Sequence, residues 1–335
     1  MTDCRVAYHP GTAPQGAAAV ELWEALGVAD KLRSSSTAFI KLNLCAAQRY
    51  EAETGVCIGR GAVSDLVRSL RAVAPDLRVA VGDSDSTGYG FAHDKFRFQG
   101  LIQAAAEGGF ELVDLSRDET ALVYCGGSFL ESVPLAKTMA EADVFISLSK
   151  IKTHNITRVT GTLKNSFGAL PTGEKKRFHP YLDAVLSDIY TAKPPDICVL
   201  DGNPAMQGNG PIHGEAVPLD LTLYGNDALA TDVEMCRLMG VEPRHASHLK
   251  HLAKRLERDL HAEPRCVSAM TRPRLAPFVE PPGSQRRLIQ TGLRVQSLGT
   301  NVEELGHLIH FARKLTDLGK VKRFVVRAFR KGRIF

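Results

Sequence analysis

The sequence lacks the patterns that would assign it to a class at once. Its seven cysteines include no CxxC pair, which favours reduced thiols in a cytoplasmic protein and disfavours an iron–sulfur cluster or a structural zinc site. No apolar run approaches the length needed to span a bilayer. The start, MTDCRVAYHPG, has no charged segment followed by an apolar one, so no secretory signal is expected. A Walker loop and a dinucleotide-binding glycine fingerprint are also missing.

The composition is that of an ordinary globular protein. The 335 residues are 44% hydrophobic and 24% charged, and this length suffices for one large or two ordinary domains. We predict a single α/β domain over residues 1–310, followed by a basic amphipathic tail, residues 311–335.

The net charge of +5 comes from this tail. Between Arg313 and Phe335, nine Lys or Arg residues and one Asp give the segment +8, which leaves −3 for the rest of the chain. Apolar residues are mixed with these cations. The pattern predicts an amphipathic helix that packs on its own domain, or else contacts a partner subunit or a membrane surface. No motif for specific nucleic-acid binding accompanies it.

Apolar strand-like runs alternate with helical patterns along most of the chain. Short continuous apolar runs, typical of strands covered on both faces, occur at 144–148 and 197–200. This alternation predicts a layered α/β fold with a largely parallel or mixed sheet flanked by helices. The expected strands are 5–9, 38–44, 78–82, 110–115, 144–148, 197–200 and 219–224, with a hairpin over 121–125 and 129–135. The expected helices are 17–32, 62–74, 96–107, 181–191, 228–238 and 244–261.

The segment from Ile146 to Pro171 carries the strongest functional signal. Its sequence, ISLSKIKTHNITRVTGTLKNSFGALP, leaves an apolar strand and then supplies several lysines, a histidine and an arginine without an acidic residue. Cations at a strand end without internal counter-charges suggest a pocket for an anionic ligand, because an unpaired buried charge is costly. The alternative is a solvated basic loop.

Polar residues also follow three other predicted strands. They are Lys41 with Asn43, Asp83 with Ser84 and Asp85, and Asp201 with Asn203. In open α/β sheets, ligands collect beyond the carboxyl ends of the strands, so one shared crevice is predicted. Taken singly, each strand end is equally consistent with a helix cap or a turn. An ion pair of Lys41 or Lys164 with Asp201 is the main structural alternative.

Several blocks of the chain resemble one known family. The blocks FIKLN, KIKTH, TGTLKNSFGALP with FHPYL, DGNPAMQGNGPIHG and NDALATDVEMCRLMG are similar to the domain-of-unknown-function family numbered 362, in the same order, between roughly Thr37 and Gly240. The resemblance implies the fold and the pocket better than it implies a reaction. Many relatives carry ferredoxin-like cysteine clusters. Because this chain lacks such clusters, the iron–sulfur label of those relatives does not extend to it.

We therefore expect an enzyme of small-molecule metabolism that performs acid–base chemistry on an anionic, oxygenated substrate, a carboxylate or a phosphate. A proton-transfer isomerase or lyase, or an oxidoreductase, fits this expectation. Histidine suits proton transfer near neutral pH, and lysines bind the anion or stabilise an enolate-like oxyanion. The catalytic candidates are His154, Lys152, Lys164 and His179. The substrate-binding candidates are Lys41, Asn43, Ser84, Thr162, Asn165, Arg158 and Asn203.

The same residues are consistent with other functions. In metal-assisted phosphoryl or phosphoester chemistry, Asp83, Asp85 and Asp201 would hold a divalent cation while the lysines neutralise the transferring group. A non-catalytic protein would use the cationic crevice to hold an anion or a cofactor. A redox electron carrier is disfavoured by the cysteine spacing.

Overall fold

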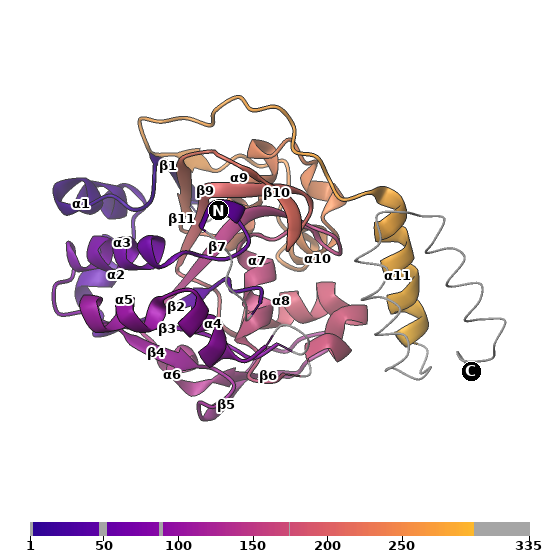
Figure 1. Ribbon diagram of the computed structural model, residues 1–335, viewed down its shortest axis with the longest axis horizontal. Helices are drawn as coiled ribbons and strands as arrows, with labels where there is room; N and C mark the ends of the chain where they lie inside the picture. Colours follow the sequence, from indigo (N-terminus) through magenta and orange to yellow (C-terminus); the bar gives the residue numbers. More distant parts are fainter. Residues whose placement is uncertain (1–2, 47–51, 87–89, 174, 298–335) are drawn as a thin grey trace.

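The computed structural model describes residues 3–46, 52–86, 90–173 and 175–297 (Figure 1). Within this part of the chain, no helix is both long and apolar enough to cross a bilayer. The basic tail, 311–335, lies outside the described residues. Its predicted helix and its predicted contacts therefore stay predictions.

Strands and helices alternate through the described chain. The strands are β1 (Arg5–Pro10), β2 (Thr37–Leu42), β3 (Arg78–Asp83), β4 (Glu111–Asp114), β5 (Thr120–Tyr124), β6 (Ser132–Ala136), β7 (Val144–His154), β8 (Arg158–Val159), β9 (Ile197–Asn209), β10 (His213–Val217), β11 (Leu221–Gly225) and β12 (Arg265–Cys266). The helices are α1 (Gly16–Ala25), α2 (Ala29–Ser34), α3 (Arg60–Arg71), α4 (Ala92–Phe98), α5 (Leu101–Gly108), α6 (Lys137–Glu141), α7 (Gly161–Asn165), α8 (Leu182–Ala192), α9 (Ala228–Leu238), α10 (Ser247–Arg255) and α11 (Gly283–Ser297). Short 3-10 helices lie in the connections, namely η1 (Ala52–Thr54), η2 (Ser166–Ala169), η3 (Lys175–Tyr181) and η4 (Pro243–His245).

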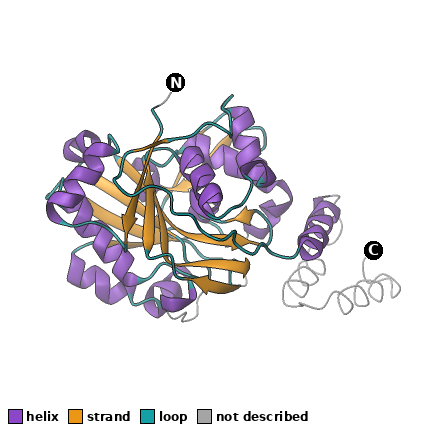
Figure 2. Cartoon of the chain, turned by 90° about the horizontal axis from the view of Figure 1, so that it is seen from above, coloured by secondary structure: helices purple, strands orange, loops and turns teal. Residues whose placement is uncertain are grey.

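Ten of the described strands form one large mixed sheet through the centre of the molecule (Figure 2). Its order is β12–β1–β11–β9–β7–β2–β3–β4, with β10 and β8 paired to β9 and β7. The pairs β9–β7, β7–β2, β2–β3 and β3–β4 are parallel, whereas β11 is antiparallel to β1 and β9. β5 and β6 form the predicted hairpin apart from this sheet. The layered α/β fold is confirmed.

Helices cover both faces of the sheet. On one face, α1 and α3 contribute Trp23 and Leu66 to an apolar cluster with strand residues. On the other face, α9 and α10 contribute Val233 and Leu249, and α8 contributes Val185. Because both faces are covered, the predicted apolar runs of β7 and β9 are buried throughout.

Some elements have bounds that differ from the predicted ones. Gly27 and Gly100 adopt positive φ angles of 75° and 68° and divide the helices predicted over 17–32 and 96–107 into two each. The helix predicted over 244–261 is shorter, because α10 ends at Arg255. β7 and β9 continue well beyond the apolar runs that predicted them. These polar extensions carry several of the predicted site residues.

Side-chain alternation decides which strand-end residues can meet. Residues two apart in a strand point to the same side of the sheet. On β2, Lys41 therefore shares with Phe39 the face that α8 covers. On β9, Asp201 shares with Val199 the opposite face, where both border a small cavity with Leu66 of α3. The predicted residues after β2, β3 and β7 therefore meet in one crevice, whereas Asp201 and Asn203 of β9 do not join it.

A pair of glycine substitutions tests this packing. At Gly82 of β3, an added Cβ would lie 2.6 Å from the Val113 carbonyl oxygen and 2.8 Å from the Phe39 ring, so Gly82→Ala should lower the free energy of unfolding by roughly 2 kcal/mol. Gly61 in α3 is exposed with open space at Cβ, so Gly61→Ala should raise it by roughly 0.5 kcal/mol. Urea denaturation measures both, and changes of equal sign would contradict the close approach of β3 to its neighbours.

Candidate functional site

The carboxyl ends of β2, β3 and β7 border one cavity. Its volume is about 140 Å³, several times the roughly 30 Å³ share of one water molecule. The segment from α7 to η3 and the turn between β9 and β10, with Pro211 and Ile212, complete its wall. Of the predicted site residues, Lys41, Asn43, Asp83, His154, Lys164, Asn165 and His179 line it. These seven residues, which are widely separated in the sequence, thus lie around one cavity.

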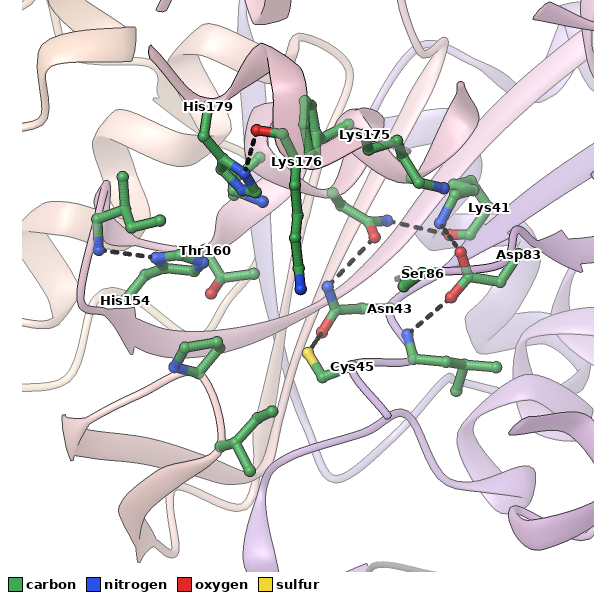
Figure 3. A pocket seen from close by; sticks show the side chains of 18 of the residues that line it. Lys41, Asn43, Cys45, Asp83, Ser86, His154, Thr160, Lys175, Lys176 and His179 are labelled. Atoms are coloured by element: carbon green, nitrogen blue, oxygen red, sulfur yellow. Dashed lines mark hydrogen bonds and ion pairs between the residues drawn. The ribbon is translucent and has the colours of Figure 1, made fainter. Parts of the chain in front are cut away.

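Figure 3 shows how the side chains lie around this cavity. Lys41, Lys175 and Asp83 lie on one side, and His154, Thr160 and His179 lie on the other. Lys176 extends between the two groups. Among the described lining residues, four are lysines and Asp83 is the only carboxylate, so the cavity is cationic.

Asp83 is the centre of a buried charge cluster. Its carboxylate accepts a hydrogen bond from Lys41 Nζ at 2.8 Å and lies 3.9 Å from Lys95 Nζ. The backbone N–H groups of Leu44 and Ser84 also donate to it, at 3.2 Å and 2.8 Å. Burial alone would raise the pKa of Asp83, but Lys41 and Lys95 outweigh it and lower that pKa. The carboxylate is therefore ionised at neutral pH.

Lys175 adds a third ammonium group to this cluster. Its Nζ donates to Ser84 Oγ and to the Leu170 carbonyl oxygen, and its side chain is only 5% exposed. Burial lowers the pKa of Lys175 to about 7, with Asp83 opposing the shift and Lys41 adding to it. One carboxylate cannot neutralise three buried lysines, so Lys175 is poised to lose its proton or to bind an anion.

His154 ends β7 and faces the cavity from the other side. Its Nδ1 accepts hydrogen bonds from the backbone N–H groups of Ile156 at 3.0 Å and Thr157 at 3.4 Å. A neutral imidazole that accepts at Nδ1 carries its proton on Nε2. The neutral ring is therefore a hydrogen-bond donor through Nε2.

Two lining residues beside His154 have unpaired polar atoms. Thr160 and Asn155 are 2% and 4% exposed, and within the described structure Thr160 Oγ1 and Asn155 Oδ1 have no hydrogen-bond partner. An unpaired buried polar atom costs about 1–3 kcal/mol. A ligand in the cavity that offers a donor would remove this cost.

Asn165 and Asn43 hold the strand ends together. Asn165 Nδ2 donates to the Lys41 carbonyl oxygen at 3.2 Å and to Ser147 Oγ at 3.1 Å. Asn43 Nδ2 donates in turn to Asn165 Oδ1 at 3.3 Å. These hydrogen bonds join β2 and β7 through Asn165. Both residues also line the cavity, where their amide groups are available to a polar ligand.

The helix α7, which carries Lys164 and Asn165, is anchored from outside the cavity. Asp232 of α9 accepts hydrogen bonds from the backbone N–H groups of Thr162 and the next residue, at 2.7 Å and 2.9 Å. Burial raises the pKa of Asp232 to about 7, although these N–H groups oppose the shift. A Cβ at Gly161, where φ is 61°, would lie 2.6 Å from the Asp232 carboxylate. Glycine therefore permits this close anchor.

An aromatic residue connects two of the predicted catalytic residues. Lys164 Nζ lies 4.9 Å from the centre of the Phe167 ring, and the His179 ring centre lies 5.2 Å from it. The Nδ1 atom of His179 is 3.1 Å from the Lys176 carbonyl oxygen. Contacts of this kind restrain both side chains at the cavity wall.

Three predicted residues lie close to the cavity without lining it. Lys152 is fully buried behind the wall and donates to the Val56 carbonyl oxygen at 2.6 Å. Ser84 is turned to the Gly168 carbonyl oxygen, to which its Oγ donates at 2.6 Å. Thr162 is buried in the first turn of α7. These residues support the wall.

Two further predicted residues are engaged elsewhere. Arg158 forms an ion pair with Glu280. Asn203 Nδ2 donates to the carbonyl oxygens of Gly11 at 2.9 Å and Leu221 at 3.1 Å, so it fixes the β9 turn against β11. Neither residue lines the cavity.

The three aspartates proposed as metal ligands do not converge. Asp83 pairs with Lys41, Asp85 lies 3.3 Å from Arg117 Nη1, and Asp201 pairs with Lys150 at 2.7 Å. Among the described residues, no three His, Cys, Asp or Glu side chains are placed to hold a metal ion. The ion pair with Asp201 exists, but its lysine is Lys150.

Sequence reasoning missed Lys175, Lys95 and Thr160. Lys175 belongs to the run GEKKRF and Lys95 to HDKFRF, and charged runs of this kind usually lie on solvated faces. Both lysines are buried near Asp83, which lies 92 residues before Lys175 in the sequence. Thr160 precedes the TGTLKN block, and only the unpaired Oγ1 in the structure marks it.

The fold and the cavity define an α/β protein with a buried cationic site at the carboxyl ends of three parallel strands. The family model described as Domain of unknown function (DUF362) matches residues 39–237, more than half of the chain. The chain belongs to this family. The match confirms the family resemblance, and its range agrees closely with the expected one, roughly Thr37 to Gly240.

Two comparisons add individual proteins. The chain is 28% identical over 184 residues to the "Thylakoid-associated protein sll1697" of Synechocystis sp., a match that covers 50% of this chain. It is also similar to the lactate racemase apoprotein from Thermoanaerobacterium thermosaccharolyticum, with a TM-score of 0.46, 10% identity and 71% of this chain covered. Either match spans 57% of the other protein's length. A structural similarity of this size says nothing about the reaction.

The buried cluster predicts a specific pH dependence of stability. The pKa of Lys175 is lowered from 10.5 to about 7, so between these pH values the unfolded chain binds a proton that the folded chain lacks, and this group's contribution to stability rises with pH. Replacing Lys175 with Met should therefore stabilise the protein most at pH 7 and below, with a gain that shrinks toward pH 10. Urea denaturation of both proteins across this range measures the difference, and a difference independent of pH would contradict the shift.

Proposed function

We propose that this protein is an enzyme of small-molecule metabolism that binds a small anionic, oxygenated substrate in the cationic cavity and transfers a proton. The observation that carries the proposal is the excess of buried positive charge, since Lys41, Lys95 and Lys175 share the single carboxylate of Asp83. A carboxylate or phosphate oxygen beside Lys175 would remove this imbalance. The substrate is an anion for this reason.

The two sides of the cavity have different roles in this proposal. Lys175 is the proton-transfer group, because a lysine whose pKa is about 7 exchanges its proton readily at neutral pH. His154 donates through Nε2 to a substrate oxygen, and Thr160 Oγ1 provides a further hydrogen bond. Such preorganised donors stabilise the negative charge that develops on an enolate-like oxygen.

The reaction class that suits this arrangement is proton transfer next to a carboxylate, as in an isomerase or a lyase. Lys164 and His179 restrain the cavity wall opposite Lys41. A cytoplasmic location remains part of the proposal, and "thylakoid-associated" describes the cyanobacterial relative.

Anion binding is the first test. Inorganic phosphate, titrated calorimetrically at pH 8, should bind with uptake of a proton, because an anion beside Lys175 raises the pKa of its ammonium group. Lys175→Met should weaken binding about tenfold to 100-fold, the loss expected for one charge-assisted hydrogen bond. Lys254→Met, which removes an exposed lysine of α10, should bind as the wild type does. Equal affinities of the wild type and Lys175→Met would contradict the proposed anion site.

Proton transfer is tested separately. In D₂O, the protein should accelerate the exchange of the C2 hydrogen of small 2-hydroxycarboxylates or of the C3 hydrogens of small 2-oxocarboxylates, measured by proton NMR. Lys175→Met should reduce the accelerated rate by about 10²-fold or more, whereas Lys254→Met should leave it unchanged. Phosphate binding without exchange of any tested acid would favour a non-catalytic anion-binding protein instead.

A further inference from the structure

A further buried lysine, Lys152, lies behind the cavity wall and has no carboxylate partner among the described residues. It is fully buried, and no described carboxylate forms an ion pair with it, in contrast to Lys150 two residues earlier. Its Nζ donates to Cys45 Sγ at 2.9 Å and to the carbonyl oxygens of Val56 and Pro211 at 2.6 Å and 3.3 Å. Two carbonyl dipoles do not neutralise a buried ammonium group. Cys45 is the one partner in this set that can carry a negative charge.

Cys45 is placed to react with a ligand. It lines the cavity and is partly exposed, whereas Lys152 lies behind it. Its Sγ is also 3.7 Å from the Asn43 amide oxygen, a longer and weaker contact than the one to Lys152. Thr160 and Asn155, whose buried Oγ1 and Oδ1 atoms have no hydrogen-bond partner in the described structure, line the same cavity.

We propose that Lys152 holds Cys45 as a thiolate and that Cys45 is a nucleophile for small anionic molecules with an electrophilic carbon. In a substitution, the thiolate lone pair forms the S–C bond while the bond from that carbon to the leaving group breaks, and the leaving group departs with its electron pair. No proton has to be removed from sulfur in this step. Lys41 and Lys175 attract the anionic part of the molecule. This part of the inference rests on the proposed function, whereas the thiolate itself does not.

Alkylation at pH 7, followed by mass spectrometry of the peptides, tests the thiolate. Neutral iodoacetamide should label Cys45 at least about tenfold faster than Cys266, because an ordinary thiol is only a few per cent ionised at this pH. Cys266 is exposed and serves as the control within the same molecule. Labelling of Cys45 no faster than of Cys266 would overturn the inference, whether or not any variant folds.

Two variants then identify the cause. Lys152→Met should reduce the rate at Cys45 about tenfold, measured on protein shown to be folded by its melting curve. The matched control removes the neighbouring pair, by Lys150→Met with Asp201→Asn, and should leave the labelling rate unchanged. An unchanged rate in folded Lys152→Met would contradict the role of Lys152.

A charged reagent separates this inference from the proposed function. Iodoacetate should label Cys45 faster, relative to Cys266, than iodoacetamide does, and inorganic phosphate should compete with it. If iodoacetamide labels Cys45 faster than Cys266 and iodoacetate shows no larger ratio of the two rates, the thiolate is supported and the proposed anion site is contradicted.

Discussion

The cavity depends on the placement of one carboxylate, Asp83, among three buried ammonium groups. Its ion pair with Lys41 joins the ends of β3 and β2, and Lys95 and Lys175 approach it from later segments of the chain. Taking any of these charges out of water is costly, and removal of one partner of a buried pair typically costs about 3–5 kcal/mol. The cluster contains more positive than negative charge. This excess destabilises the folded state and attracts an anion.

The fold holds this cluster in place through parallel strands and remote anchors. Neighbouring parallel strands end at the same edge, which brings Lys41, Asp83 and His154 to one cavity. Asp232 of α9 then fixes the first turn of α7, whose Lys164 and Asn165 form the facing wall. The helix α9 packs on the sheet through its own apolar cluster. The hydrophobic core therefore holds this wall in place, in addition to the loop that contains α7.

Lys175 and Lys152, two of the buried lysines at or near the cavity, differ in how their charge is balanced. Burial, with a smaller contribution from Lys41 and Lys95, lowers the pKa of Lys175 to about 7, which suits a group that gains and loses a proton. Lys152 has a thiol in place of a carboxylate, which suits a nucleophile beside that group. A cavity with both would combine acid–base and covalent chemistry on one anionic ligand.

The alternation of strands and helices and the family could be predicted from the amino-acid sequence alone, as could the gathering of polar strand-end residues at one edge of the sheet. The sequence also identified Lys41, Asp83, His154 and Lys164 as residues that share a cavity. The pairing of Asp201 with Lys150 on the opposite face and the burial of Lys175 near Asp83 could not be predicted in this way. Both outcomes depend on strand register and on packing between distant segments. A sequence pattern reports the neighbours of a residue along the chain, whereas burial and charge balance are set by neighbours in space.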